Sequence, residues 1–151
     1  MNRGFTLLMT LLYVTASLSI GIGVALLIAG EVALSGTGRD SQFAFYAADF
    51  GAECALYWDL RHEGFPESPF TVPPAENPFT IQCGGDSTVE EVSYDAGTDL
   101  FTFSSKLDNN TCVDVSFKRK SDGGGEIIAR GHNICPGQPG RRVERGLKVE
   151  Y

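Results

Sequence analysis

The chain has 151 residues, enough for one modest domain and an appendage. Its 12 lysines and arginines are outnumbered by 19 aspartates and glutamates, which gives a formal net charge of −7. Because contacts to phosphates need a basic surface, this balance argues against a nucleic-acid partner.

The amino-terminal segment is strongly apolar. Residues 5–30 form a run of 26 residues without charge, longer than the roughly 20 that a helix needs to cross a bilayer. A secretory signal has a shorter apolar core of about 7–15 residues, so the run predicts a membrane-spanning helix. Arg3 is the only charge before it, and basic residues tend to stay in the cytoplasm. We therefore expect a single-pass membrane protein, with its amino terminus inside and residues beyond about 31 outside.

The helical pattern continues over residues 31–62, the outer half of one long helix. There, apolar and mostly small residues recur at spacings of three and four and form one face. Its members are Phe43, Ala44, Ala47, Ala48, Gly51, Ala52, Ala55 and Leu56. Four acidic residues are expected largely outside this face: Asp40, Asp49, Glu53 and Asp59. Since small residues let another backbone approach closely, we expect the face to be buried against a sheet.

The rest of the chain predicts a loop and then a sheet. Residues 63–78 are rich in proline, which removes backbone donors and favours extended or turn geometry. From residue 79 to 151 the pattern alternates with period two, which is typical of half-buried antiparallel strands. We expect strands, joined mainly as a meander, at 79–83, 88–94, 99–106, 111–119, 126–132 and 142–150. The fold class is therefore α+β, a long amino-terminal helix packed on a small antiparallel sheet.

Four cysteines lie on the expected outer side, at Cys54, Cys83, Cys112 and Cys135. An even number in an oxidising compartment suggests two disulfides, for which three connectivities exist. If the strands 111–119 and 126–132 form a hairpin, Cys135 falls near Cys112. That favours Cys112–Cys135 and leaves Cys54 to pair with Cys83.

Metal binding and catalysis find little support. His132 and Cys135 are three residues apart, but there is no Cys-x-x-Cys pair of the kind that structural zinc sites use. The sequence DAGTD, from Asp95 to Asp99, offers only two carboxylates, and a polar hairpin turn explains it better than a calcium site. No serine lies in a G-x-S-x-G context. We expect no cofactor, no metal and no enzymatic activity.

The leader carries the sharpest motif, Arg3-Gly4-Phe5-Thr6-Leu7-Leu8. It resembles the class III signal of type IV prepilins and pseudopilins. The resemblance implies that residues 1–4 are removed by a prepilin peptidase, which cuts between Gly4 and Phe5 and methylates the new terminus. It also implies a pilin-like fold, in which residues 5–30 serve first as membrane span and then as filament core.

A second stretch, DSQFAFYAADFGAE at residues 40–53, looks like the corresponding region of PilX-type minor pilins and of tip pseudopilins. Arg39 would be its basic member, and Asp49 stands where those families often have Glu. The resemblance covers the first 60 residues; beyond them only the general architecture matches.

The resemblance makes other pilins or pseudopilins the partners, bound through the amino-terminal helix. Gly21 and Gly23 belong to small-x-x-x-small spacings, which favour helix contacts in lipid, although such spacings are common in single anchor helices. The residues expected to serve assembly are Met9, Gly21, Gly23, Ala44, Ala47, Ala48 and Gly51.

Met9 departs from the pattern of major pilins, which usually carry Glu at the fifth position after the cleaved glycine. A carboxylate inside a membrane costs about 2.5–3.5 kcal/mol, and in the family its pairing with a neighbour's amino terminus offsets that cost. Met9 cannot form this pair, and the first acid follows only at Glu31. The departure favours a minor, tip or initiating subunit. The alternative is drift, with the hydroxyls of Thr6 or Thr10 partly substituting.

Two functions therefore stand. One is a minor pilin or pseudopilin that ends in a pilus or pseudopilus used for adhesion, motility, DNA uptake or secretion. The other is a membrane-anchored extracytoplasmic binding domain that does not polymerise. Loss of residues 1–4 and methylation of Phe5 would distinguish the first from the second.

Overall fold

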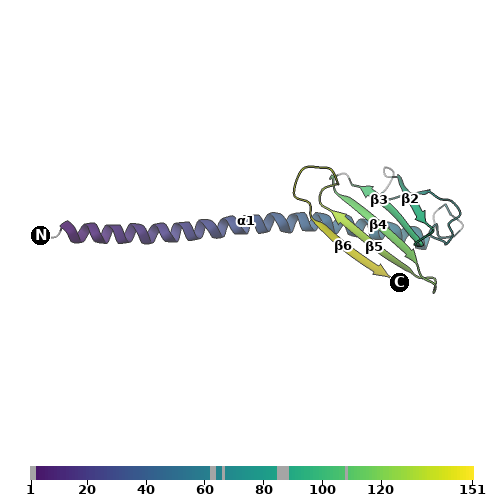
Figure 1. The fold of residues 1–151 in the computed structure, drawn as a ribbon, viewed down its shortest axis with the longest axis horizontal. Coiled ribbons are helices and arrows are strands. Elements are labelled where there is room, and N and C mark those ends of the chain that lie inside the picture. Colours follow the sequence, from purple (N-terminus) through teal and green to yellow (C-terminus); the bar gives the residue numbers. More distant parts are fainter. Residues whose placement is uncertain (1–2, 62–63, 66, 85–88, 108) are drawn as a thin grey trace. The chain divides into compact units, whose positions relative to one another are not determined.

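The computed structural model describes residues 3–61, 64–65, 67–84, 89–107 and 109–151. It contains one helix and six strands (Figure 1). These are α1 (Arg3–Arg61), β1 (Phe79–Gln82), β2 (Val89–Asp95), β3 (Leu100–Lys106), β4 (Cys112–Arg119), β5 (Gly125–His132) and β6 (Glu144–Glu150). The chain divides into two compact units, residues 1–39 and 40–151, each described here by itself.

The first unit is the amino-terminal part of α1. Its apolar side chains are exposed, and the helix is long and apolar enough to cross a membrane. The expected helix is confirmed as far as Arg61; His62, where the expected helix was to end, lies outside the described residues.

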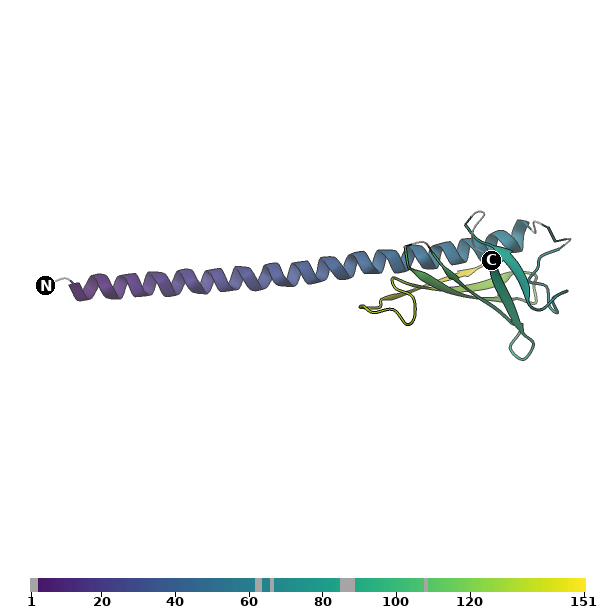
Figure 2. The same cartoon turned by 90° about the horizontal axis from the view of Figure 1, so that it is seen from above.

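The second unit contains the rest of α1 and an antiparallel meander in the order β1-β2-β3-β4-β5-β6, as the alternating pattern predicts. The strand bounds fall within two residues of those expected. In β3, Phe101, Phe103 and Ser105 are buried while the residues between them are exposed, so one face of the sheet forms the core. Figure 2 shows the carboxyl-terminal part of α1 along one face of the sheet, so this part of the helix supplies the second layer of the domain.

The small-residue face of α1 is confirmed as the part of the helix that meets the sheet. Ala44, Ala47, Ala48 and Ala55 are fully or almost fully buried. Two of the expectations for this face are wrong. Phe43 is 41% exposed, because it lies one residue, or about 100°, before Ala44 on the helix, and Asp59 is only 4% exposed.

The loop before β1 contributes to the core. Phe70 is completely buried, and its ring stacks on Phe117 with centroids 4.5 Å apart. Phe79 and Phe101 contact it edge to face. Offset and edge-on aromatic contacts add to the stabilisation that burial alone provides. The proline-rich segment is therefore an integral layer of the domain.

Candidate functional site

The expected processing and assembly residues of the first unit lie along an exposed helix. Gly4 is part of the α1 backbone, and the side chains of Phe5 and Met9 are 65% and 51% exposed. No atom would lie within 4 Å of a Cβ added to Gly21 or Gly23. The first unit thus presents a continuous apolar surface without an internal partner among its described residues.

The four expected assembly residues of the second unit lie in a different environment. Ala44, Ala47, Ala48 and Gly51 are buried against the chain's own sheet. A Cβ added to Gly51 would come within 2.6 Å of the Val113 side chain. We therefore assign these four residues to the packing of the helix on the sheet of the domain.

The contact between helix and sheet also needs a glycine on the strand side. A Cβ on Gly131 in β5 would lie 2.0 Å from the carbonyl oxygen of Ala44 and 2.4 Å from the amide nitrogen of Ala48. Here strand and helix touch backbone to backbone, which only glycine permits. The pairing of small residues explains why the face of α1 is rich in alanine.

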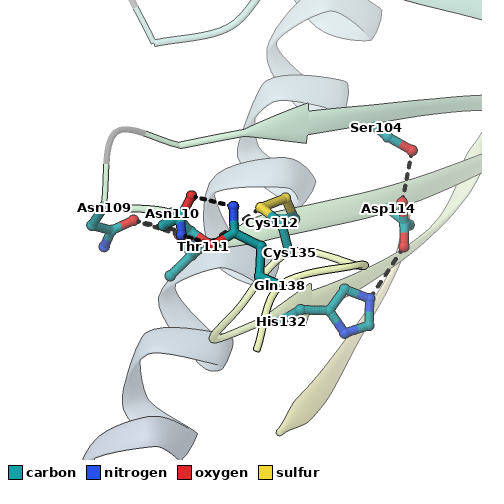
Figure 3. Close-up of a disulfide and its surroundings, with 9 residues drawn as sticks. All are labelled: Ser104, Asn109, Asn110, Thr111, Cys112, Asp114, His132, Cys135 and Gln138. Carbon is teal, nitrogen blue, oxygen red and sulfur yellow. Dashed lines mark hydrogen bonds and ion pairs between the residues drawn. A yellow bond between two sulfur atoms is a disulfide. The ribbon is translucent and has the colours of Figure 1, made fainter. Parts of the chain in front are cut away.

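Both predicted disulfides are present, Cys54–Cys83 and Cys112–Cys135. The first ties α1 to the residue after β1. The second follows from the hairpin register, in which Cys112 lies opposite His132 (Figure 3). It holds the loop after β5 to the start of β4. The same loop is fastened by reciprocal side-chain amide hydrogen bonds between Asn110 and Gln138.

A buried ionic cluster lies at the end of β4 away from the Cys112–Cys135 disulfide. The sequence alone did not predict it. The carboxylate of Asp59 accepts hydrogen bonds from Arg119, Ser68 and Tyr151. Burial alone would raise the pKa of Asp59, but these hydrogen bonds and the charge of Arg119 together hold it below its ordinary value of 3.8. Burial and the bond to Asp59 raise the pKa of Tyr151. Arg119 also donates to the carbonyl oxygens of Phe70 and Gly123.

The spacing of residues along α1 could have indicated that Asp59 is buried. Asp59 follows Ala48, Ala52 and Ala55 at steps of four, three and four, which places it on the buried face. A carboxylate at such a position needs a buried partner. The partner itself, Arg119, lies 60 residues away and has no local signature.

A polar group on the opposite face of the sheet has the residue types of a catalytic triad but not its order (Figure 3). Ser104 donates to Asp114 Oδ1 at 2.7 Å, and His132 Nε2 lies 3.1 Å from Asp114 Oδ2. In a triad, histidine lies between serine and aspartate so that it can take the serine proton. Here aspartate is in the middle, so Ser104 donates to a carboxylate instead of to the imidazole of His132. The arrangement joins strands β3, β4 and β5.

The metal alternatives receive no support from the geometry. Cys135 is bonded to Cys112, so no thiolate stands beside His132. In the DAGTD turn, Asp95 accepts from Gly97 and Thr98, and these bonds lower its pKa. Asp99 accepts from the Tyr94 hydroxyl at 2.7 Å. Among the residues that the structure describes, no cluster of three or more His, Cys, Asp or Glu side chains has metal-binding geometry.

Comparison with known proteins adds nothing to these observations. No family profile, no curated protein and no solved structure matches the chain significantly.

Proposed function

We propose that the protein is a minor type IV pilin or pseudopilin, a structural subunit that assembles through its amino-terminal helix. The observation that carries the proposal is the continuity of α1. A helix that begins at the Arg3-Gly4-Phe5 motif contains an apolar membrane-length segment and ends on an antiparallel meander. Processing signal, membrane segment and domain anchor thus share one element, as an assembling subunit of this class requires.

The proposed path begins in the inner membrane. The amino terminus lies in the cytoplasm and the domain of residues 40–151 outside, which agrees with the pairing of all four cysteines in that domain. A prepilin peptidase removes residues 1–4, and the exposed apolar surface of the first unit then packs against neighbouring subunits. The absence of a carboxylate at Met9 supports a minor, tip or initiating position.

The decisive experiment is the mass of the mature amino terminus in protein purified from its own cells. The proposal expects loss of Met1–Gly4 and one added methyl group on Phe5. A Gly4→Leu variant should keep its leader, whereas a Thr6→Ser control should be processed normally. An intact amino terminus in the unaltered protein would contradict the proposal.

The second candidate, a membrane-anchored binding domain that does not polymerise, is favoured by an open cavity in the loop between α1 and β1. It predicts an unprocessed chain that stays monomeric in the membrane. Cross-linking in whole cells, followed by separation by size, would show a ladder with other subunits for a pilin and a single band for an anchored monomer.

A further inference from the structure

The loop between α1 and β1 encloses a half-open cavity of about 440 Å³. The described lining residues up to Thr71 form one wall, and those from Ala75 to Phe79 form the other. The described lining residues are Gly64, Phe65, Glu67, Ser68, Pro69, Thr71, Ala75, Glu76 and Phe79. This volume is that of a small ligand or of one large side chain with its flanking backbone.

The first wall is held in place by the buried ionic cluster. Ser68 donates to Asp59 and accepts from Arg119 at 2.8 Å and from the amide of Phe70 at 3.2 Å. Arg119 also donates to the Phe70 carbonyl oxygen. These bonds attach residues 68–70 to both α1 and β4.

The second wall is attached to the sheet. The Asn77 side chain donates to the carbonyl of Tyr94 and accepts from its amide, both at 3.0 Å, and thereby continues the ladder beyond β1. Phe79 is buried and pairs with Val92 in β2. Since both walls are anchored independently, the cavity is preformed and a ligand need not order it on binding.

The negative charges at the cavity favour a cationic ligand. Glu67 and Glu76 are exposed, and neither carboxylate has a hydrogen-bond or ion-pair partner within the part of the chain that the structure describes. None of the described lining residues is basic. Residues 40–151 carry 18 acidic and 10 basic side chains, so the surrounding field also attracts cations.

The aromatic side chains of the cavity favour one kind of cation over another. Phe65 is half-buried and lies against Phe79 and Trp58, with ring centroids 6.2 and 6.0 Å apart. A guanidinium group stacks on aromatic rings and forms forked hydrogen bonds with carboxylates, whereas an ammonium group is a compact, strongly hydrated charge. We propose that this cavity binds an arginine side chain of a partner protein. The proposal goes beyond assembly through the helix and does not depend on it.

The test uses the full chain, isotope-labelled with ¹⁵N, in detergent micelles at constant ionic strength. The probe is the tripeptide acetyl-Gly-Arg-Gly-amide, and the matched control replaces arginine by citrulline, which has nearly the same shape without the charge. We expect saturable shifts of the amide signals of residues 64–79 and of the indole signal of Trp58, the only tryptophan. Citrulline should bind at least about tenfold more weakly, because a charge-assisted hydrogen bond is roughly twice as strong as a neutral one.

Substitutions of the two glutamates test whether the arginine peptide binds in this cavity. Glu67→Gln combined with Glu76→Gln should reduce the affinity for the arginine peptide at least about tenfold. Glu91→Gln, which changes an exposed carboxylate on β2, should leave it unchanged. Amide spectra of the free variants verify that the fold is intact. A second control peptide carries lysine in place of arginine. Binding of the citrulline or the lysine peptide as tight as that of the arginine peptide, unchanged binding by the double variant, or no shift in residues 64–79 would each overturn the proposal.

Discussion

At the scale of single residues, two glycines determine how closely α1 lies to the sheet. Gly51 on the helix admits the side chains of Val113 and Val115, and Gly131 on β5 admits the helix backbone itself. The two positions differ in what an added methyl group would meet. A side chain can rotate away, whereas the backbone near Ala44 and Ala48 can move only if the helix shifts.

Gly131→Ala should therefore destabilise the domain by about 3 kcal/mol, at the upper end of the usual cost of overpacking. Gly146→Ala is the matched control, because the nearest atom to its added Cβ is 4.0 Å away, and it should change stability by no more than about 0.5 kcal/mol. Urea unfolding of the full chain in micelles, followed by Trp58 fluorescence, measures both. Equal stability of the two variants would mean that the helix is free to move outward.

Asp59 makes stability depend on pH. Its pKa is lower in the folded protein than its ordinary value of 3.8, so the carboxylate stabilises the fold fully above that value. This contribution is lost as the pH falls below 3.8 and through the lowered pKa. At pH 7, Asp59→Asn should cost about 3 kcal/mol, because it leaves Arg119 without its buried counter-charge.

The corresponding measurement is the difference in unfolding free energy between the native chain and Asp59→Asn from pH 7 to pH 2. The difference should be constant down to about pH 4 and then shrink. A Tyr151→Phe variant, which removes one hydrogen bond to Asp59 but keeps the ion pair, should retain the loss of stability in acid. A difference that stayed constant to pH 2 would show that folding does not lower the pKa of Asp59.

At the scale of elements, the strands with alternating burial, such as β3 and β4, were predictable from the sequence. In β4, Val113, Val115 and Phe117 alternate with more exposed residues, and period-two burial of this kind is visible in a single sequence. The pairing Cys112–Cys135 was predictable for the same reason, since the register of one hairpin is local information. Contacts of the loop before β1 were not predictable, because Phe70 and Phe117 are 47 positions apart in the sequence and no spacing encodes their contact.

The two disulfides close loops of similar length, with sequence separations of 29 and 23 residues. Loop-closure entropy then gives each about 3.5 kcal/mol. Replacing either pair by serine should lower the unfolding free energy by a similar amount, and peptide mapping without reduction should recover both pairings. The loss of Cys112–Cys135 should also free the loop after β5, so hydrogen exchange should rise at the amides of position 135 and Gln138 but not at β1. Equal exchange in both double variants would contradict this division.

At the scale of the whole molecule, the chain combines an exposed apolar helix with a domain whose core is complete. The organisation of this helix was predictable, because composition alone marks a segment of 26 uncharged residues. The cavity was not predictable from the sequence, because Glu67 and Glu76 lie on two walls that come together only in the folded chain.

Met9 provides a test of position in the proposed filament. Met9→Glu would supply the missing carboxylate, which could pair with a neighbour's amino terminus. Under the proposed function, the tagged native subunit should label filament ends, whereas the Met9→Glu subunit should also appear along the shaft. Met9→Leu is the apolar control and should remain at the ends. Uniform labelling by the native subunit would contradict a tip role.

The hydrogen bond between Tyr151 and Asp59 joins residues 92 positions apart, and Tyr151 also pairs its backbone with Gly125. During synthesis the helix therefore emerges long before the group that completes its buried carboxylate. Until β4 and β5 are in place, the small-residue face of α1 is uncovered, and until Tyr151 follows, Asp59 lacks one of its three donors. Because such distant contacts form slowly, the nascent domain passes through a stage in which its apolar helix face is open. That interval is when a chaperone or a wrong partner has access to the chain.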